Sequence, residues 1–152
     1  MNWVVEMPEV FSRGVAYDAV LTVTDRATQM VHFIPTNAHE TDEDTADLFL
    51  RNVVRLHGLP RSLIYDRDHR FTPYFWRTIC ERLDVKHLLT TAYHPQTNGQ
   101  AERTNQTMKK LLRAAQFEGS SWFDVLPHGE VAMNSASLPD TKWTPLCVPR
   151  AF

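Results

Sequence analysis

Cysteine is scarce in this sequence of 152 residues, which contains only Cys80 and Cys147. The two cysteines do not have the spacing of a ligand pair, which argues against a disulfide-stapled scaffold and against a zinc ribbon. Cysteines of this kind are typical of a protein kept in a reducing compartment. The fold must then rest on a packed core, and 43% hydrophobic residues at this length are enough for one globular domain.

Long apolar runs and a signal peptide are also missing. A membrane-spanning helix needs about 20 mostly apolar residues, so we expect a soluble, intracellular protein with no membrane partner. Neither sign of charge is in large excess, since the net charge is −2 and the isoelectric point is about 6.4. Domains that bind nucleic acid are usually more basic, so any DNA binding must come from a local patch or from other domains.

The pattern of apolar residues predicts an α/β domain. Strands are predicted at residues 1–7, 17–24, 30–34, 63–66 and 85–89, with turns at 12–14 and 25–28. Helices are predicted from Thr41, which has the pattern of a cap with Asp44, to Gly58, from Thr72 to about 83, from about 99 to 117 and from a cap at Ser120-Ser121 to about 136. Three antiparallel strands followed by alternating helices and strands indicate a five-stranded mixed sheet flanked by helices, with an irregular, proline-containing tail from about residue 138. A glycine-rich phosphate loop is absent, which disfavours a dinucleotide-binding fold.

Two carboxylates stand at structurally defined points of this pattern. Asp66 ends a short apolar strand, and Glu102 begins a long helix after a turn-rich stretch, with 35 residues between them. A strand end and the first turn of a helix are rigid positions, and carboxylate oxygens are the ligands that Mg²⁺ prefers. The pair can therefore converge on divalent metal.

The stretches around both carboxylates resemble the catalytic blocks of retrotransposon integrases, with Ty3/gypsy-type integrase cores as the closest match. One block runs from His57 to Thr72 and the other from Thr91 to Asn105. Both are long and contain unusual dipeptides, and the resemblance extends over nearly the whole chain, 1–152. It implies a ribonuclease-H-like fold and a core that processes the 3′ ends of element DNA and transfers them into target DNA. It also implies two Mg²⁺ or Mn²⁺ ions, action on DNA in the nucleus, and a homodimer or higher oligomer.

The residues fit that chemistry in part. Displacement at phosphorus is stabilised by two metal ions that hold the attacking and the leaving oxygen, and Asp66 and Glu102 are ligands of the right type. Positions 102, 106, 109 and 113 follow one face of the predicted helix. We therefore expect Gln106, Lys109 and Arg113 to contact DNA, with Lys109 as the main phosphate contact. The loop before the helix adds Tyr93 and Gln96 as substrate-positioning residues.

Position 2 departs from the family pattern. The first of the family's three metal-binding carboxylates, an aspartate, lies in its opening strand, where this sequence reads Met1-Asn2-Trp3-Val4. An asparagine offers a neutral carbonyl oxygen and lacks the negative charge of aspartate. We therefore expect weak metal binding and impaired catalysis, while Asp18 and Asp25 are expected not to reach the site. One alternative is a domesticated, non-catalytic module that binds DNA or protein; a weaker one is a ribonuclease H enzyme.

Overall fold

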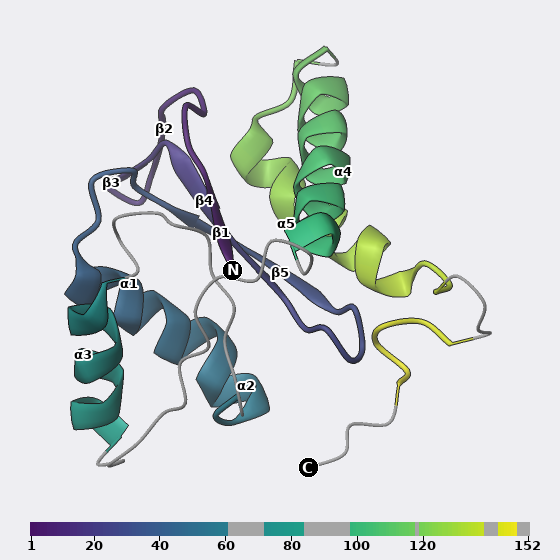
Figure 1. Ribbon diagram of the computed structural model, residues 1–152. Coiled ribbons are helices and arrows are strands. Elements are labelled where there is room, and N and C mark those ends of the chain that lie inside the picture. Colours follow the sequence, from purple (N-terminus) through teal and green to yellow (C-terminus); the bar gives the residue numbers. More distant parts are fainter. Residues whose placement is uncertain (61–71, 84–97, 118, 139–142, 149–152) are drawn as a thin grey trace.

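The computed structural model describes residues 1–60, 72–83, 98–117, 119–138 and 143–148. Its central sheet is antiparallel, with the strand order β1 (Asn2–Val4), β4 (Ala19–Thr24) and β5 (Val31–Thr36) (Figure 1). The expectation of three antiparallel strands at the start of the chain is confirmed. The strands predicted at 63–66 and 85–89 lie outside the described residues.

The first strand is shorter than predicted. It was expected to extend to residue 7, but it ends at Val4, and Glu6 has a left-handed backbone with φ of 63°. A residue with positive φ cannot continue the pleat of a strand. The chain instead leaves the sheet and forms a separate hairpin.

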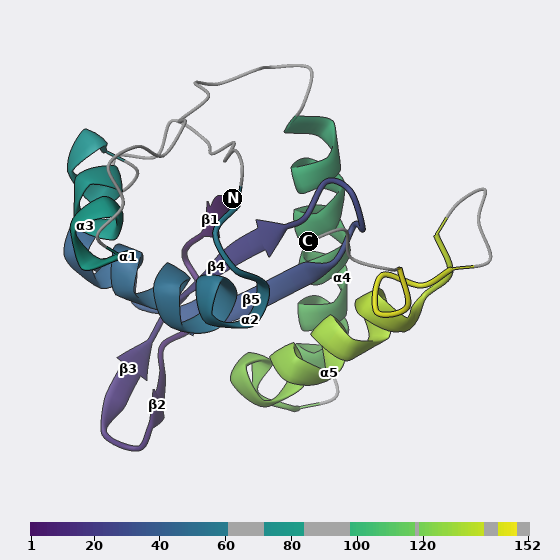
Figure 2. The same cartoon turned by 90° about the horizontal axis from the view of Figure 1, so that it is seen from below.

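This hairpin consists of β2 (Val10–Ser12) and β3 (Val15–Tyr17), neither of which was predicted as a separate strand (Figure 2). The expected turn at Ser12-Arg13-Gly14 is confirmed. Arg13 and Gly14 have φ of 51° and 80°, and two successive positive φ values are what a tight two-residue hairpin turn requires.

The third strand of the sheet was expected to stop before Pro35, and this was wrong. Pro35 lies inside β5 and pairs with Val20 of β4. The amide groups of Val31 and Phe33 point away from β4, toward side chains of another helix. By the alternation of a strand, the missing N–H of Pro35 falls on the same outer side, where no bond to β4 is lost.

One face of the sheet is covered by the helical segment that begins after Thr41 and by α3 (Pro73–Leu83). The segment comprises α1 (Asp42–Phe49), a π-helical turn η1 (Leu50–Val54) and α2 (Arg55–His57). The predicted cap is confirmed: Thr41 Oγ1 accepts the N–H of Asp44, and the Asp44 carboxylate accepts the N–H of Thr41. Gly58 follows the last turn with φ of 74°, as expected for a helix end.

The other face is covered by α4 (Asn98–Phe117) and α5 (Trp122–Ser135), both within one or two residues of the predicted helices (Figure 1). Alternate residues of each strand supply two separate cores. Leu21 and Ile34 pack with Phe49 on the α1 face, whereas Val20 and Phe33 pack with Met108 on the α4 face. Among the described helices, none is long and apolar enough to cross a membrane.

Candidate functional site

Position 2 lies on the face of the sheet that α4 covers. Asn2 is half-buried in β1 and is paired with Thr22 of β4. It alternates with Trp3, which belongs to the α1-side core, and has the same parity as Val4, which belongs to the α4-side core. Asn2 is therefore held by a regular strand under α4.

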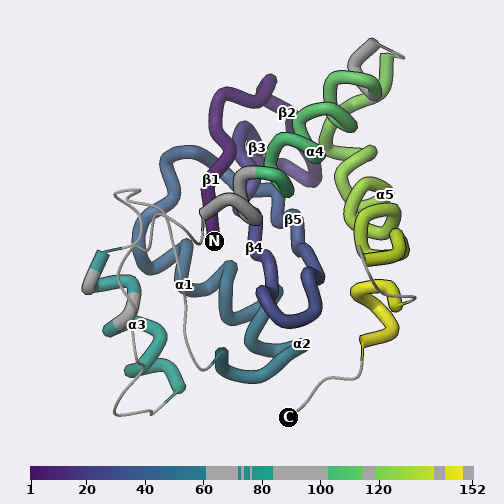
Figure 3. The backbone as a smooth tube through the Cα atoms, turned by 45° about the vertical axis from the view of Figure 1, so that its right-hand side comes forward, coloured from purple at the N-terminus to yellow at the C-terminus, as the bar shows by residue number. Residues whose placement is uncertain are grey.

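The start of α4 is tied to this point by a buried hydrogen bond. Thr22 Oγ1 lies 2.9 Å from Asn105 Oδ1 and 3.1 Å from the backbone oxygen of Asn2, and its single hydroxyl hydrogen is shared between these two acceptors. Figure 3 shows the coloured part of α4 running away from the N-terminal strand. Sequence reasoning missed Thr22 and Asn105 as a pair because they are 83 residues apart.

Only part of the predicted metal site can be located. Glu102 lies in α4, three residues before Asn105, whereas Asp66, Tyr93 and Gln96 lie outside the described residues. Within the described part of the chain, no three His, Cys, Asp or Glu side chains gather closely enough to hold a metal ion. The structure thus brings the helix of Glu102 beside Asn2, and the position of Asp66 lies outside this described part.

The predicted polar stripe on α4 is exposed. Gln106, Lys109 and Arg113 all face solvent, whereas Met108 and Leu112 of the same helix are buried. At about 100° per residue, these three positions and position 102 fall within roughly 60° of one another around the helix axis. Lys110 is also exposed but lies farther around the helix.

Asp18 and Asp25 are engaged in turns of the backbone. Asp18 Oδ1 accepts the N–H of Ala38 at 2.6 Å. The carboxylate of Asp25 accepts hydrogen bonds from Ala27 and Thr28 in the expected β4–β5 turn. Both carboxylates stabilise loops through these hydrogen bonds.

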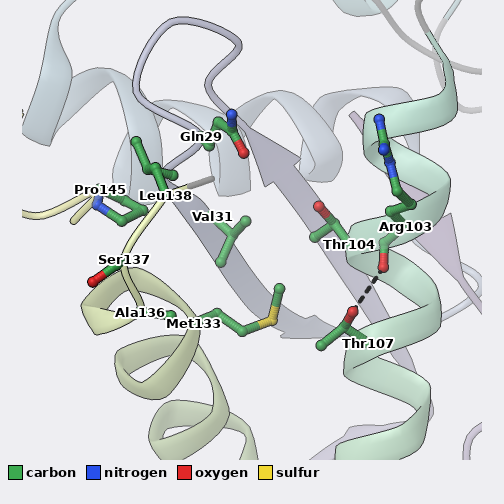
Figure 4. A pocket seen from close by; sticks show the side chains of 10 residues that line it. All are labelled: Gln29, Val31, Arg103, Thr104, Thr107, Met133, Ala136, Ser137, Leu138 and Pro145. Atoms are coloured by element: carbon green, nitrogen blue, oxygen red, sulfur yellow. Dashed lines mark hydrogen bonds between the residues drawn. The ribbon is translucent and has the colours of Figure 1, made fainter. Parts of the chain in front are cut away.

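A hollow of about 410 Å³ lies on the opposite flank of α4 from the stripe. Figure 4 labels its ten lining residues, which come from α4, the start of β5, the end of α5 and the tail. Thr104 and Thr107 form the α4 wall, and Thr107 Oγ1 donates to the backbone oxygen of Arg103 at 3.0 Å. Val31 and Met133 contribute apolar side chains to the lining of the hollow. Nothing in the sequence pattern predicted this hollow.

A second polar cluster was also missed. His32 of β5, His57 of α2 and Glu130 of α5 form a chain of contacts at the outer edge of the sheet. His57 shows no metal-ligand spacing in the sequence, and its neighbours in space are distant along the chain. No local signal could have grouped these residues.

Comparisons with known proteins give sequence relatives and structures with the same fold. No family model matches the chain. It is 34% identical over 146 residues to the Transposon Tf2-3 and Tf2-4 polyproteins of Schizosaccharomyces pombe, an alignment that covers 95% of this chain and 11% of theirs. The chain therefore spans about a ninth of the length of these relatives.

Solved structures give the fold. The integrase catalytic core domain of HTLV-2, in complex with magnesium, superposes with a TM-score of 0.66 at 18% identity, over 95% of this chain and 93% of that one. The catalytic core domain of BIV integrase gives a TM-score of 0.66 at 20% identity, over 95% and 90%. The chain has the fold of these integrase catalytic cores.

The chain thus has the ribonuclease-H-like fold that the resemblance implied. A simian T-cell lymphotropic virus intasome, solved with a PP2A regulatory subunit, also superposes on it with a TM-score of 0.68 at 18% identity, over 95% of this chain and 52% of that one. The relation to retrotransposon polyproteins stated from the sequence is confirmed.

Proposed function

We propose that the chain is the catalytic core of an integrase-type polynucleotidyl transferase, which processes the 3′ ends of element DNA and joins them to target DNA. One observation carries the proposal. The strand that holds position 2 and the helix that holds Glu102 are linked side by side through Thr22 and Asn105. This link holds Asn2 and the helix of Glu102 beside each other, which supports a metal site shared by the two positions.

Two of the three residues assigned to this site are of the type that binds divalent metal. Asp66 and Glu102 would hold Mg²⁺ or Mn²⁺ through carboxylate oxygens, the ligand type that such hard cations prefer. Two bound ions stabilise the attacking and leaving oxygens in a displacement at phosphorus. Support comes from the HTLV-2 core, whose structure is a complex with magnesium. Asn2 fits less well, because its side chain offers one neutral oxygen where the family has a carboxylate.

We assign the exposed stripe of α4 to DNA. Lys109 and Arg113 supply positive charge on the helix face of position 102, and Gln106 supplies a neutral hydrogen-bonding group between position 102 and Lys109. Cations on one helix face attract the phosphate backbone independently of base sequence. Tyr93 and Gln96 are assigned to positioning of the DNA end.

The asparagine at position 2 reduces this activity. A site that holds two divalent cations is weakened when one of its negative charges is lost. The remaining carboxylates then compensate for less of the free energy needed to dehydrate the ions. We propose that the chain binds metal weakly and transfers strands slowly or not at all.

The experiment is a strand-transfer and nicking assay on labelled duplex DNA with Mn²⁺. Wild type is compared with Asn2→Asp, with the double variant Asn2→Asp/Glu102→Gln, and with Asn37→Asp as a control that adds the same charge in the turn after β5. Activity that rises only in Asn2→Asp and vanishes in the double variant supports the proposal. Equal activity in wild type and Asn2→Asp, with both folded by circular dichroism, contradicts the role of position 2.

The partners follow from this function. We propose that copies of the chain form a homodimer or a higher oligomer, supported by the dimeric and trimeric forms of the HTLV-2 core, and that they meet element ends and target DNA in the nucleus. Light scattering across a concentration series tests the oligomer. A constant monomer mass at all concentrations contradicts it.

The neutral residue at position 2 also favours a second candidate, a domesticated module that binds DNA or protein without catalysis. Such a module keeps the α4 stripe and needs no metal. Binding of duplex DNA that is unchanged by EDTA, together with an inactive Asn2→Asp variant, would favour it over the enzyme.

A further inference from the structure

Thr22 occupies a junction of three elements. Its hydroxyl reaches the backbone oxygen of Asn2 in β1 at 3.1 Å and the side-chain oxygen of Asn105 in α4 at 2.9 Å. Thr22 itself belongs to β4 and is paired with Asn2 in the sheet. Both side chains are buried, with 3% of Thr22 and 8% of Asn105 exposed.

The surroundings of this contact are apolar. The next contacts of α4 with the sheet come from Met108 and Leu112, which pack with Val4 and Val20. Apolar packing is non-directional, so it allows a helix to slide and rotate by small amounts. A hydrogen bond depends on distance and angle, and a buried amide without a partner is costly. The bond between Thr22 and Asn105 therefore fixes where α4 stands on the sheet.

Asn105 is also close to the catalytic position along the helix. Glu102 precedes it by three residues, which is a rise of about 4.5 Å along the helix axis. A residue that fixes Asn105 on the sheet also fixes the backbone from which the Glu102 side chain extends. The same hydroxyl holds the backbone of Asn2, so one threonine sets the separation of two ligand positions.

We propose that Asn105 is a positioning residue for Glu102, with Thr22 as its anchor on the sheet, and that this pair sets the geometry of the metal site. The inference rests on the proposed function, because it assigns Glu102 to metal binding. It adds two residues that do not touch the metal. Groups that orient metal ligands in this way typically change metal affinity about 10- to 100-fold when they are removed.

The test measures Mn²⁺ affinity by calorimetry in the full chain carrying Asn2→Asp. Thr22→Val removes the hydroxyl at nearly constant volume, and Thr22→Ser keeps it. Thr45→Val is the matched control, because Thr45 is fully buried and its hydroxyl donates to the backbone oxygen of Thr41 on the opposite face of the sheet. Unfolding in urea is measured for every variant.

We expect Thr22→Val to weaken Mn²⁺ binding at least about tenfold, Thr22→Ser to restore it, and Thr45→Val to leave it unchanged despite a loss of stability. Equal Mn²⁺ affinity in Thr22→Val and its parent overturns the inference, as does an equal loss in Thr45→Val. If Thr22→Val does not fold, Asn105→Ser is measured in its place. If Asn2→Asp itself gains no Mn²⁺ affinity over wild type, the proposed metal site fails, and the positioning role fails with it.

Discussion

His32 and Glu130 meet at the outer edge of β5, with 3.0 Å between Nδ1 and Oε1. The other oxygen of Glu130 accepts the backbone N–H of Phe33 at 2.7 Å. On its far side, His32 Nε2 lies 2.7 Å from Nε2 of His57. One carboxylate from α5 thus satisfies a strand amide and orients an imidazole that reaches the opposite helical layer.

Asn134, one turn after Glu130, completes the protection of this edge. Its side chain accepts the N–H of Val31 and donates to the oxygen of Val31, both at 2.8 Å. The next two outward positions are Phe33, bonded to Glu130, and Pro35, which has no N–H. Exposed strand edges are sites of unwanted pairing between molecules, and here side chains occupy the hydrogen-bonding groups.

Replacing Glu130 with alanine should destabilise the fold. Glu130→Ala leaves the N–H of Phe33 without its acceptor and removes the partner of His32, so we expect a loss of about 1–3 kcal/mol in the free energy of unfolding. Urea denaturation at neutral pH measures it. Glu81→Ala is the control, since Glu81 forms only an exposed pair with Arg77, which contributes little. Similar losses in the two variants would contradict the role of Glu130.

A change of one atom in Asn134 should also be costly. Asn134→Asp keeps an acceptor for the N–H of Val31 but loses the donor to its oxygen and places two oxygens in contact, so we expect a loss of about 1–3 kcal/mol. In Asn37→Asp the acceptor for the N–H of His39 is retained and only a long bond of 3.5 Å to the oxygen of Ala16 is lost, so unfolding should change less. A neutral result at Asn134 would mean that the edge does not depend on this amide.

The α4 stripe predicts a specific salt dependence of DNA binding. Lys109→Gln and Arg113→Gln should each weaken binding of duplex DNA and reduce the slope of log Kd against log salt by about one unit per phosphate contact. Fluorescence anisotropy in a series of KCl concentrations measures both quantities. Lys110→Gln removes the same charge from another side of the helix. If it has the same effect as Lys109→Gln, the stripe is not the contact surface.

Two carboxylates at the start of α1 predict opposite pH effects. The hydroxyl and N–H of Thr41 lower the pKa of Asp44, so its contribution to stability is present above its unfolded pKa and is lost as the pH falls through the folded value. Burial, together with the charge of Asp44, raises the pKa of Glu40. Stability linked to Glu40 is therefore present at acidic pH and is lost as the pH rises through its folded value.

Glu40→Gln should consequently stabilise the protein at pH 7 and have less effect at pH 4. We expect a gain of roughly 0.5 kcal/mol at pH 7, because solvent screens a half-buried carboxylate. Urea unfolding at the two pH values measures it, with Glu9→Gln as an exposed control. A loss of stability at pH 7 would show that the hydrogen bond from Thr36 outweighs the desolvation of Glu40.

Local signals in the sequence predicted much of the helical structure. The Thr41–Asp44 cap, the proline after Thr72 and the cap at Ser121 each act within a few residues, so the pattern carries them directly. The exposed face of α4 follows from helical periodicity alone. Asn2 also lies in the predicted strand, on the face that α4 covers.

Features that depend on distant neighbours were not predicted. Pro35 is acceptable inside β5 because its outer side is an edge, and this is a property of the sheet order. The bonds of Thr22 with Asn105 and of Val31 with Asn134 span 83 and 103 residues. The β2–β3 hairpin has strands of only three residues, too short for a clear alternation.

The π-helical turn η1 has a consequence for insertions and deletions. The N–H of Arg55 bonds to the oxygen of Leu50, five residues back, so the helix accommodates one residue more than an α-helical path would. Because the widened turn absorbs this extra residue, deleting one residue from Leu50–Val54 would restore an ordinary α-helical turn and leave His57 facing His32. A deletion within Asp42–Phe49 would instead rotate the two parts of the helix relative to each other by about 100°. The π-helical turn is therefore a point at which this helix tolerates the loss of a residue.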